Sequence, residues 1–141
     1  MEALSEDELR ELFKHDHYAT DACDCTIEEA RPGYARCSFE IQQKHRNQRG
    51  EVMGGALFTI GDFAIAVASN ASGMAHVAVN CNFQFLTTVK GSRVIAEAKA
   101  DRDGRHLAFY TADITDELGT KVAKMTSVGF AIGEIPRGQE H

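Results

Sequence analysis

The longest hydrophobic run of the chain lies between Gly54 and Asn70 and predicts a helix. The run is shorter than the roughly 20 residues that cross a bilayer, and it begins with two glycines. We therefore expect a helix of a protein core rather than a membrane span. Its large apolar residues fall on every side of a helix, as in a core helix; they are Leu57, Phe58, Ile60, Phe63, Ile65 and Val67.

On both sides of this helix, apolar and polar residues alternate with a period of two, which is typical of half-buried β-strands. Turn sequences such as Arg31-Pro32-Gly33 and Asp103-Gly104 separate the alternating stretches. A first, amphipathic helix is predicted over residues 4–13 with Ser5 as its N-cap. The predicted strands are residues 25–30, 34–41, 77–85, 93–102, 107–115 and 121–132. In residues 77–85 the odd-numbered positions form one face, which we expect to lie against the helix.

The order of these elements indicates the fold class. No helical segment interrupts the last four strands, so neighbouring strands can pair antiparallel. The expected architecture is α+β, with an antiparallel sheet wrapped around one central hydrophobic helix. At 141 residues the chain suits a single domain, residues 1–141, and only the tail after Pro136 is expected to be loose.

Composition excludes several functional classes. The net charge is −6 with both signs scattered along the chain, so there is no basic footprint for a nucleic acid. The amino terminus lacks the layout of a signal peptide, and we expect a cytoplasmic protein. The four cysteines lack zinc-finger or redox spacing, so we expect buried thiols and no metal; they are Cys23, Cys25, Cys37 and Cys81.

Asp62 is the single ionisable residue of the hydrophobic helix. An unpaired carboxylate is costly to bury, so its presence indicates a chemical use, although an acid that only satisfies a buried amide is the structural alternative. The other polar residues of the helix fall on the same stripe at helical spacing, with small residues between them. This stripe predicts a cleft along the helix; its members are Gly55, Thr59, Asp62, Ala66 and Ser69.

The glycine pair Gly54-Gly55 begins the same helix. The first turn of a helix has free N–H groups at the positive end of its dipole, which can polarise a carbonyl group. Gly54 and Asp62 are eight residues apart, about 12 Å along a helix. Because a base must lie within about 3.5 Å of the carbon attacked, one helix cannot supply both groups. If both act, two copies must pair their helices antiparallel, giving a homodimer with composite sites.

The segment Asn47-x-x-Gly50-x-x-Met53-Gly54-Gly55-x-x-Phe58-x-x-x-Asp62 strongly resembles the signature of the hotdog-fold acyl-CoA thioesterases, especially the phenylacetyl-CoA type. The order of elements agrees over nearly the whole chain. The resemblance implies a hotdog fold and hydrolysis of an acyl-CoA to a free acid and coenzyme A. It implies that Asp62 is the nucleophile or general base, that the Gly54 N–H polarises the carbonyl, and that Asn47 places substrate or water.

The sequence departs from this family at Met53, where histidine is usual. A thioether makes no useful hydrogen bond, so we expect altered loop order or rate rather than inactivity. His45 is nearby, but a solvated loop histidine is the expected state. The family often has a serine or threonine on the next strand to assist the aspartate; here the candidates are Ala78, which cannot, and Asn80.

The resemblance also predicts how the substrate is bound. Coenzyme A is part of the substrate, and no separate cofactor is expected. Its phosphates need a local basic patch, for which the candidates are Lys90, Arg93, Arg102, Arg105 and His106. The acyl group is expected to be aryl or of medium length. Gly55 and Phe58 are expected to bind the substrate, with Leu57 and Phe63 as further candidates for lining its pocket.

Two dimers are expected to join into a tetramer through sheet surfaces, on the polar face of Asn80, Asn82 and Gln84. The alternative function is a non-catalytic hotdog protein that binds acyl-CoA or an aromatic acid, with Met53 marking a lost activity. A hotdog dehydratase is a third possibility. Its chemistry needs a histidine paired with an acid at the helix, and neither position 53 nor the helix has one.

Overall fold

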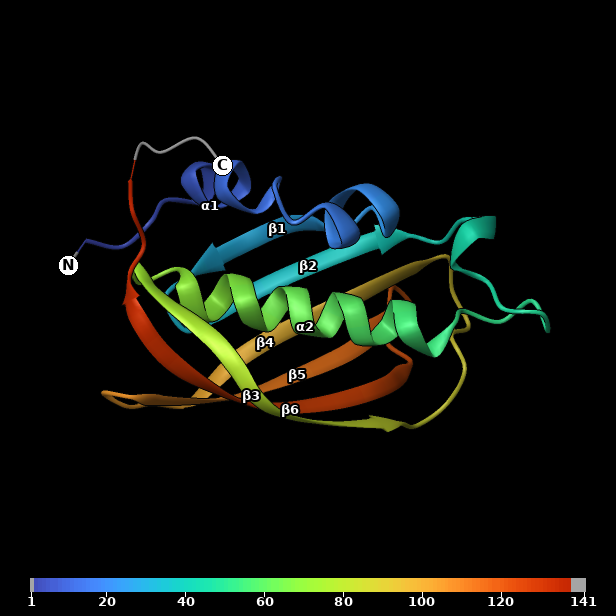
Figure 1. Cartoon of the computed structure of the whole chain (residues 1–141). Helices are drawn as coiled ribbons and strands as arrows, with labels where there is room; N and C mark the ends of the chain where they lie inside the picture. Colours follow the sequence, from blue (N-terminus) through green and yellow to red (C-terminus); the bar gives the residue numbers. More distant parts are fainter. Residues whose placement is uncertain (1, 138–141) are drawn as a thin grey trace.

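Helix α2 (Gly54–Asn70) lies in the hollow of a curved six-stranded sheet in the computed structural model, which describes residues 2–137 (Figure 1). The sheet order is β1-β2-β4-β5-β6-β3, and every neighbouring pair is antiparallel. This arrangement confirms the predicted hotdog architecture. The strands are β1 (Thr26–Arg31), β2 (Tyr34–Glu40), β3 (Met74–Phe85), β4 (Arg93–Asp103), β5 (Leu107–Asp116) and β6 (Lys121–Glu134).

The core lies between α2 and the inner face of the sheet. Fully buried alanines on the strands leave room for the helix to approach, among them Ala96, Ala98, Ala108 and Ala112. Gly61 marks the closest approach: a Cβ atom there would lie 3.0 Å from Met125 Sδ and 3.3 Å from Ile114 Cδ1. A larger residue would push the helix off the sheet, because protein interiors have few voids to absorb it.

Helix α1 (Glu6–Phe13) has the predicted N-cap, a capping box between Ser5 and Glu8. It packs beside β1: Arg10 donates hydrogen bonds to the carbonyl oxygens of Ile27 and Glu28, and Glu6 accepts one from the Ala30 N–H. These contacts place α1 next to the first edge strand of the sheet (Figure 1). The opposite edge strand, β3, pairs with β6 alone among the described strands.

Strand β3 differs from the prediction in its faces. A β-bulge between Ala78 and Asn80 sets Val79 and Asn80 opposite Val128, so the alternation reverses there. Cys81, Phe83 and Phe85 lie on the side of α2 as expected. Val77, by contrast, is opposite Phe130 on the outer face. The prediction that residues 77 and 79 face the helix is therefore wrong, because alternation is counted without bulges.

Two short helical turns were not predicted, and the expectation for one cysteine needs correction. A single π-helical turn, Tyr18–Ala22, and a 3₁₀ turn, Gln43–His45, lie outside the predicted helices and strands. Cys81 is exposed, unlike the three buried cysteines. Among the described residues no helix is long and apolar enough to cross a membrane, and no three His, Cys, Asp or Glu form a metal-binding group. The predicted loose tail lies partly at residues 138–141, outside those described.

Candidate active site

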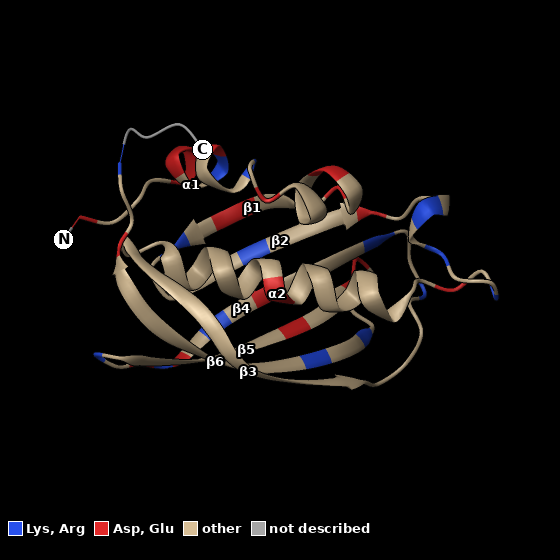
Figure 2. Ribbon diagram, viewed as in Figure 1, with Lys and Arg blue, Asp and Glu red and all other residues tan. Residues whose placement is uncertain are grey.

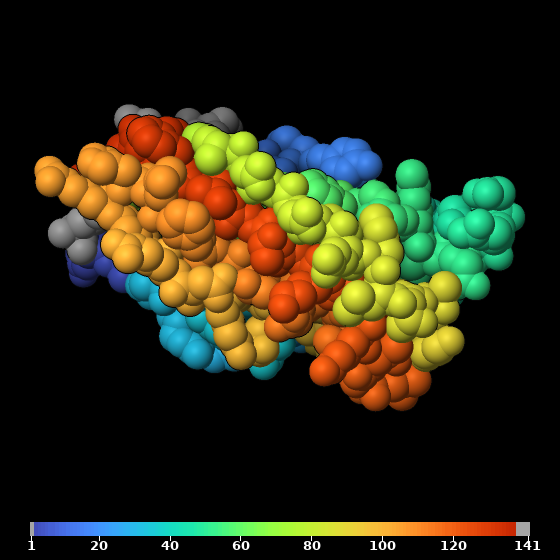
Figure 3. Space-filling view, turned by 90° about the horizontal axis from the view of Figure 1, so that it is seen from below, coloured from blue at the N-terminus to red at the C-terminus, as the bar shows by residue number. Residues whose placement is uncertain are grey.

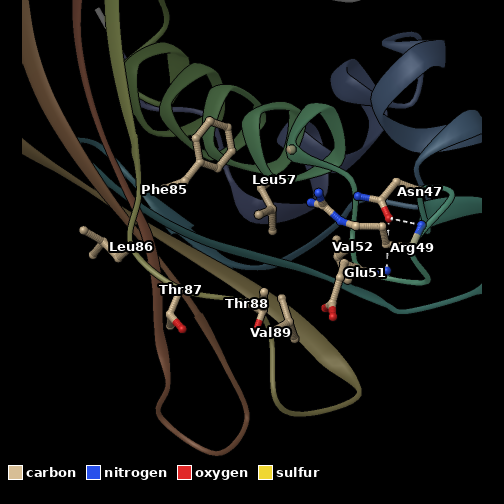
Figure 4. A pocket seen from close by; sticks show the side chains of 11 residues that line it. Asn47, Arg49, Glu51, Val52, Leu57, Phe85, Leu86, Thr87, Thr88 and Val89 are labelled. Atoms are coloured by element: carbon tan, nitrogen blue, oxygen red, sulfur yellow. Dashed lines mark hydrogen bonds between the residues drawn. The ribbon is translucent and has the colours of Figure 1, made fainter.

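A cavity of about 410 Å³ opens at the start of α2. Its lining combines apolar side chains, among them Val52, Leu57 and Phe85, with polar ones. Its wall combines the loop before α2 with residues that follow β3 (Figure 4). The lining residues are Asn47, Arg49, Glu51, Val52, Gly54, Leu57, Phe85, Leu86, Thr87, Thr88 and Val89. Two of the three predicted catalytic residues, Asn47 and Gly54, therefore share one cavity.

Asn47 organises the loop that enters this cavity. Its side-chain Oδ1 accepts hydrogen bonds from the backbone N–H of Arg49 (2.9 Å) and Glu51 (3.2 Å), drawn as dashed lines in Figure 4. Arg46 closes the same loop by donating to the Gly50 carbonyl oxygen (2.8 Å). Gly50 has φ +78°, a conformation that glycine adopts without strain. The Asn47 oxygen is thus engaged in the loop, and its amide N–H₂ has no partner within residues 2–137.

His45 is buried, which corrects the expectation of a solvated side chain. It is 3% exposed, and its ring stacks on Phe39 with centroids 4.2 Å apart. Nδ1 accepts a hydrogen bond from the Gln42 N–H (3.0 Å), so Nε2 carries the proton and donates to the Cys23 carbonyl oxygen (2.8 Å). The His45 carbonyl oxygen accepts from the Met53 N–H (2.8 Å). His45 therefore connects the start of α2 to strand β2 and to the segment that precedes β1.

The start of α2 offers two free donors. Neither the Gly54 nor the Gly55 N–H has an acceptor within residues 2–137, whereas the Ala56 and Leu57 N–H both reach the Met53 carbonyl oxygen. Free N–H groups at a helix start can bind a developing oxyanion. Met53 occupies the N-cap position, but its side chain makes no capping hydrogen bond and is 56% exposed.

The exposed ring of Phe85 lies close to position 54. A Cβ atom there would lie 2.9 Å from Phe85 Cε1. Phe85 is the end of a row of three aromatic rings. The ring centroids of Phe85 and Phe83 are 4.7 Å apart, and those of Phe83 and Phe58 are 5.6 Å apart. Sequence analysis missed Phe85 as a site residue, although its alternation in β3 placed it on the side of the helix.

Asp62 lies on the exposed stripe of α2, and Figure 2 shows a single acidic band on this helix. Its carboxylate has no hydrogen bond or ion pair within the described residues. Burial by the surrounding protein raises the pKa of Asp62, and the negative charge of Asp16 raises it further. Such a carboxylate is a stronger base than an ordinary one.

The stripe predicted along α2 is largely present. Gly55, Thr59, Asp62 and Ala66 are exposed or partly exposed in the single chain. Ser69 is not part of it, because this residue is buried and its hydroxyl donates to the Ala66 carbonyl oxygen (3.3 Å). Helix α2 is continuous over Gly54–Asn70, so Gly54 and Asp62 stay about 12 Å apart along its axis. Asp62 does not line the cavity that contains Gly54.

The predicted basic residues do not form one patch in a single chain. Lys90 follows the cavity residue Val89, whereas Arg102 and Arg105 lie at the far end of β4, about 30 Å away at 3.3 Å per residue. Figure 2 shows lysines and arginines at both ends of the molecule. Arg93 forms ion pairs with Glu28 and Glu40. Arg49, which lines the cavity, was not predicted.

Asn80 lies away from Asp62. The bulge in β3 turns Asn80 to the outer face, opposite Val128, and leaves Ala78 opposite Gly129 on the inner face. The prediction that Asn80 assists Asp62 is therefore wrong for a single chain. Alanine cannot take that role either.

The loop between β3 and β4 is fixed by a carboxylate. Asp116, 2% exposed, accepts backbone hydrogen bonds from Lys90 and Gly91 through Oδ2 and from Leu118 and Thr120 through Oδ1, at 2.9–3.0 Å. Burial alone raises the pKa of Asp116, but these donors outweigh it and hold the pKa at about 2. These contacts anchor the end of the β3–β4 loop next to the cavity residue Val89.

Comparisons with known proteins agree with this geometry. A family model described as "Thioesterase superfamily" matches residues 49–123. The acyl-coenzyme A thioesterase PaaI of Escherichia coli K12 is 28% identical over 89% of this chain and 93% of its own length. The solved structure of E. coli PaaI, from the phenylacetic acid degradation operon, has a TM-score of 0.78 at 26% identity and covers 92% of this chain and 98% of its own. A mutant of the phenylacetic acid degradation protein PaaI from Thermus thermophilus has a TM-score of 0.75 at 29% identity, covering 80% and 97%.

Proposed function

The chain belongs to the thioesterase superfamily and is a thioester hydrolase, and we propose that it hydrolyses an aryl- or medium-chain acyl-CoA to the free acid and coenzyme A. One observation carries this proposal. Helix α2 has two unpaired N–H groups at its start and an unpaired carboxylate of raised pKa on its exposed stripe. The N–H groups can stabilise the oxyanion that forms on the thioester oxygen, and the carboxylate can act as a base or nucleophile.

In the proposed reaction the Gly54 N–H donates to the thioester oxygen and polarises the carbonyl. Asp62 either removes a proton from water as the water oxygen attacks the carbonyl carbon, or attacks that carbon itself and forms an anhydride that water hydrolyses. In both cases the carbon–sulfur bond breaks and the coenzyme A thiolate leaves and takes up a proton. The Asn47 amide N–H₂ is free to place the water or the carbonyl. The reaction needs only water and groups of the chain.

The proposed active unit is a homodimer. Strand β3 is an edge strand, and the α2 stripe beside it is open to solvent, so antiparallel pairing of two copies covers both. Asp62 of one copy then meets Gly54 of the other. The midpoint between residues 54 and 62 is Phe58, 38% exposed, which we place on the two-fold axis.

Coenzyme A would be held by cations of both copies. Arg49 and Lys90 are near the cavity that contains Gly54. Arg102 and Arg105 lie at the end of the subunit opposite to its own cavity. Antiparallel pairing of two subunits brings them to the end where the cavity of the other copy opens. The basic patch that the sequence analysis placed in one chain is thus proposed to be composite.

We also propose that two dimers join through the outer face of the sheet, the face seen in Figure 3. The register places Asn80 opposite Val128, and this polar row continues through Asn82 and Gln84. Beside it is an apolar group that sequence analysis missed. Its members are Val77, Leu107, Phe109 and Phe130, all of them exposed in the single chain. Exposed apolar patches of this kind mark contact surfaces.

The decisive experiment is hydrolysis of a panel of acyl-CoA esters, with the released thiol measured by a thiol-reactive dye. We expect turnover of aryl or medium-chain esters and a loss of at least about 10²-fold in kcat for Asp62→Asn, with acyl-CoA binding retained. Asp113→Asn, an exposed aspartate on β5, is the matched control and should keep wild-type rates. Tight binding without turnover of any ester would instead identify a binding protein.

A further inference from the structure

A second cavity, of about 500 Å³, lies at the other end of α2. It is bounded by the end of α1, the last residue of α2, the start of β3 and the residues after β6. Its described wall is mostly apolar and has no Lys or Arg. The lining residues are Leu12, Phe13, His15, Asp16, Asn70, Ala75, Ile135 and Pro136.

This cavity is close to the candidate catalytic carboxylate. Phe13 in its wall packs edge-on against Phe63, the neighbour of Asp62, with ring centroids 5.7 Å apart. Asp16, also in the wall, is near enough to raise the pKa of Asp62. Asn70 is two turns beyond Asp62, about 12 Å along the helix, and the small, partly exposed Ala66 lies between them.

Asn70, at the end of this cavity, already makes hydrogen bonds within the chain. Its amide donates to the Ala66 carbonyl oxygen (2.6 Å) and its Oδ1 accepts from the His76 N–H (2.9 Å). His15 and Asp16 are the other polar residues of the wall, and the remaining ones are apolar. A cavity of this size with apolar walls is suited to a hydrocarbon group.

A thioester has two arms, and the two cavities differ in charge. The first cavity has both Arg49 and Glu51 in its wall and Lys90 beside it, and these two cations can bind the phosphates of the coenzyme A arm. The second has the carboxylate of Asp16 instead, which repels phosphate. If Asp62 meets Gly54 of another copy, the second cavity of one copy lies about 12 Å along α2 from the reacting carbon, and the first cavity of the other copy contains the Gly54 N–H that polarises the carbonyl.

We propose that the second cavity binds the acyl group of the substrate, and that it selects an uncharged aryl or straight medium-length chain. This inference rests on the proposed function for the identity of the ligand. It assigns acyl selection to the end of α1 and the start of β3, rather than to the core residues Leu57 and Phe63. Asp16 excludes acyl groups that end in a carboxylate.

Two substitutions test the proposal in opposite directions. Ala75→Leu fills the cavity, and we expect kcat/KM for octanoyl-CoA to fall at least about tenfold, as for other steric discrimination in apolar pockets. The same variant should retain its rate on propionyl-CoA, which serves as the control for correct folding. Leu12→Ala enlarges the cavity and should move the preference to longer chains. An equal change on short and long esters in both variants would overturn the proposal.

Asp16→Asn tests the electrostatic part. Removing the negative charge should raise kcat/KM for glutaryl-CoA relative to hexanoyl-CoA. It should also move the acid limb of the pH–rate profile to lower pH, because one cause of the raised pKa of Asp62 is removed. An unchanged glutaryl-to-hexanoyl ratio would show that Asp16 does not face the acyl group.

Binding of unreactive analogues separates this inference from the proposed function. Octyl-CoA and ethyl-CoA thioethers cannot be hydrolysed, so calorimetry reports their affinities even if no ester is turned over. We expect wild type to bind the octyl analogue more tightly and Ala75→Leu to lose that difference. Equal affinity of wild type for both analogues would refute the acyl site, whereas absent turnover with preserved octyl preference would refute catalysis alone.

Discussion

Two inactive variants should restore activity to each other if the active site is composite. Asp62→Ala removes the carboxylate from every site. Gly54→Val blocks the helix start, because even a Cβ at this position would lie 2.9 Å from Phe85 Cε1 and a branched side chain would also cover the free N–H groups. Alone, each variant should be inactive, since each two-fold dimer carries its defect in both sites.

The size of the recovery follows from symmetry. A mixed dimer has one site with both defects and one site with neither. In an equal, randomly exchanged mixture half of the dimers are mixed, and each has one of two sites intact. About a quarter of the wild-type activity should therefore return. A site built within one chain would give no recovery, because every chain carries a defect.

The assay is hydrolysis of the best ester of the panel before and after subunit exchange, with exchange verified by native mass spectrometry of isotope-labelled chains. The matched control mixes Asp62→Ala with the double variant Asp62→Ala/Gly54→Val, which exchanges equally but has no carboxylate and should stay inactive. Verified exchange without recovery in the first mixture would refute antiparallel pairing of the α2 helices. It would also remove the reason for placing Phe58 on the two-fold axis.

Three further predictions concern the groups that build the site. Asn47→Asp keeps the oxygen that accepts from the loop N–H groups but loses the amide donor, so kcat should fall about tenfold while stability is kept; a wild-type rate would show that the donor is unused. His45→Phe keeps the ring stack on Phe39 but leaves the Gln42 N–H and the Cys23 carbonyl oxygen without their hydrogen-bond partner. The free energy of unfolding in urea should therefore fall by about 2 kcal/mol, and an unchanged value would contradict the structural role of His45. The pKa of Asp116 is lower in the folded chain, about 2, than its ordinary value of 3.8, so the carboxylate stabilises the fold above about pH 4 and this contribution is lost as the pH falls toward 2. Asp116→Asn should therefore cost about 2 kcal/mol at pH 7 and little at pH 2, with Asp113→Asn as an exposed control. Equal stability curves for wild type and Asp116→Asn would refute the prediction.

The sequence was sufficient to predict the elements that depend on local pattern. An apolar run with one acid predicted helix α2, and alternation with turn sequences between stretches predicted all six strands. The capping box at Ser5 was likewise readable, because its groups are three residues apart. The grouping of Asn47 and Gly54 in one cavity follows from their closeness in the chain.

What the sequence did not predict depends on contacts between distant segments. The bulge at Val79 reverses the faces of β3, yet nothing in the alternation of residues 77–85 marks it. His45 is buried because Phe39 and Cys23 surround it from other segments. The basic residues were grouped by charge type, although β4 separates Lys90 from Arg102 by most of its length.

The composition of the open edge strand bears on how the protein can be made in a cell. Over its whole length, Met74–Phe85, strand β3 has no Lys, Arg, Asp or Glu, the charged residues with which natural edge strands discourage pairing with the wrong chain. If the proposed dimer forms through this edge, a newly made chain presents the open side of a twelve-residue strand without guarding charges until a second copy arrives. Correct assembly then competes with aggregation, and the yield of native protein depends on how quickly identical chains meet each other.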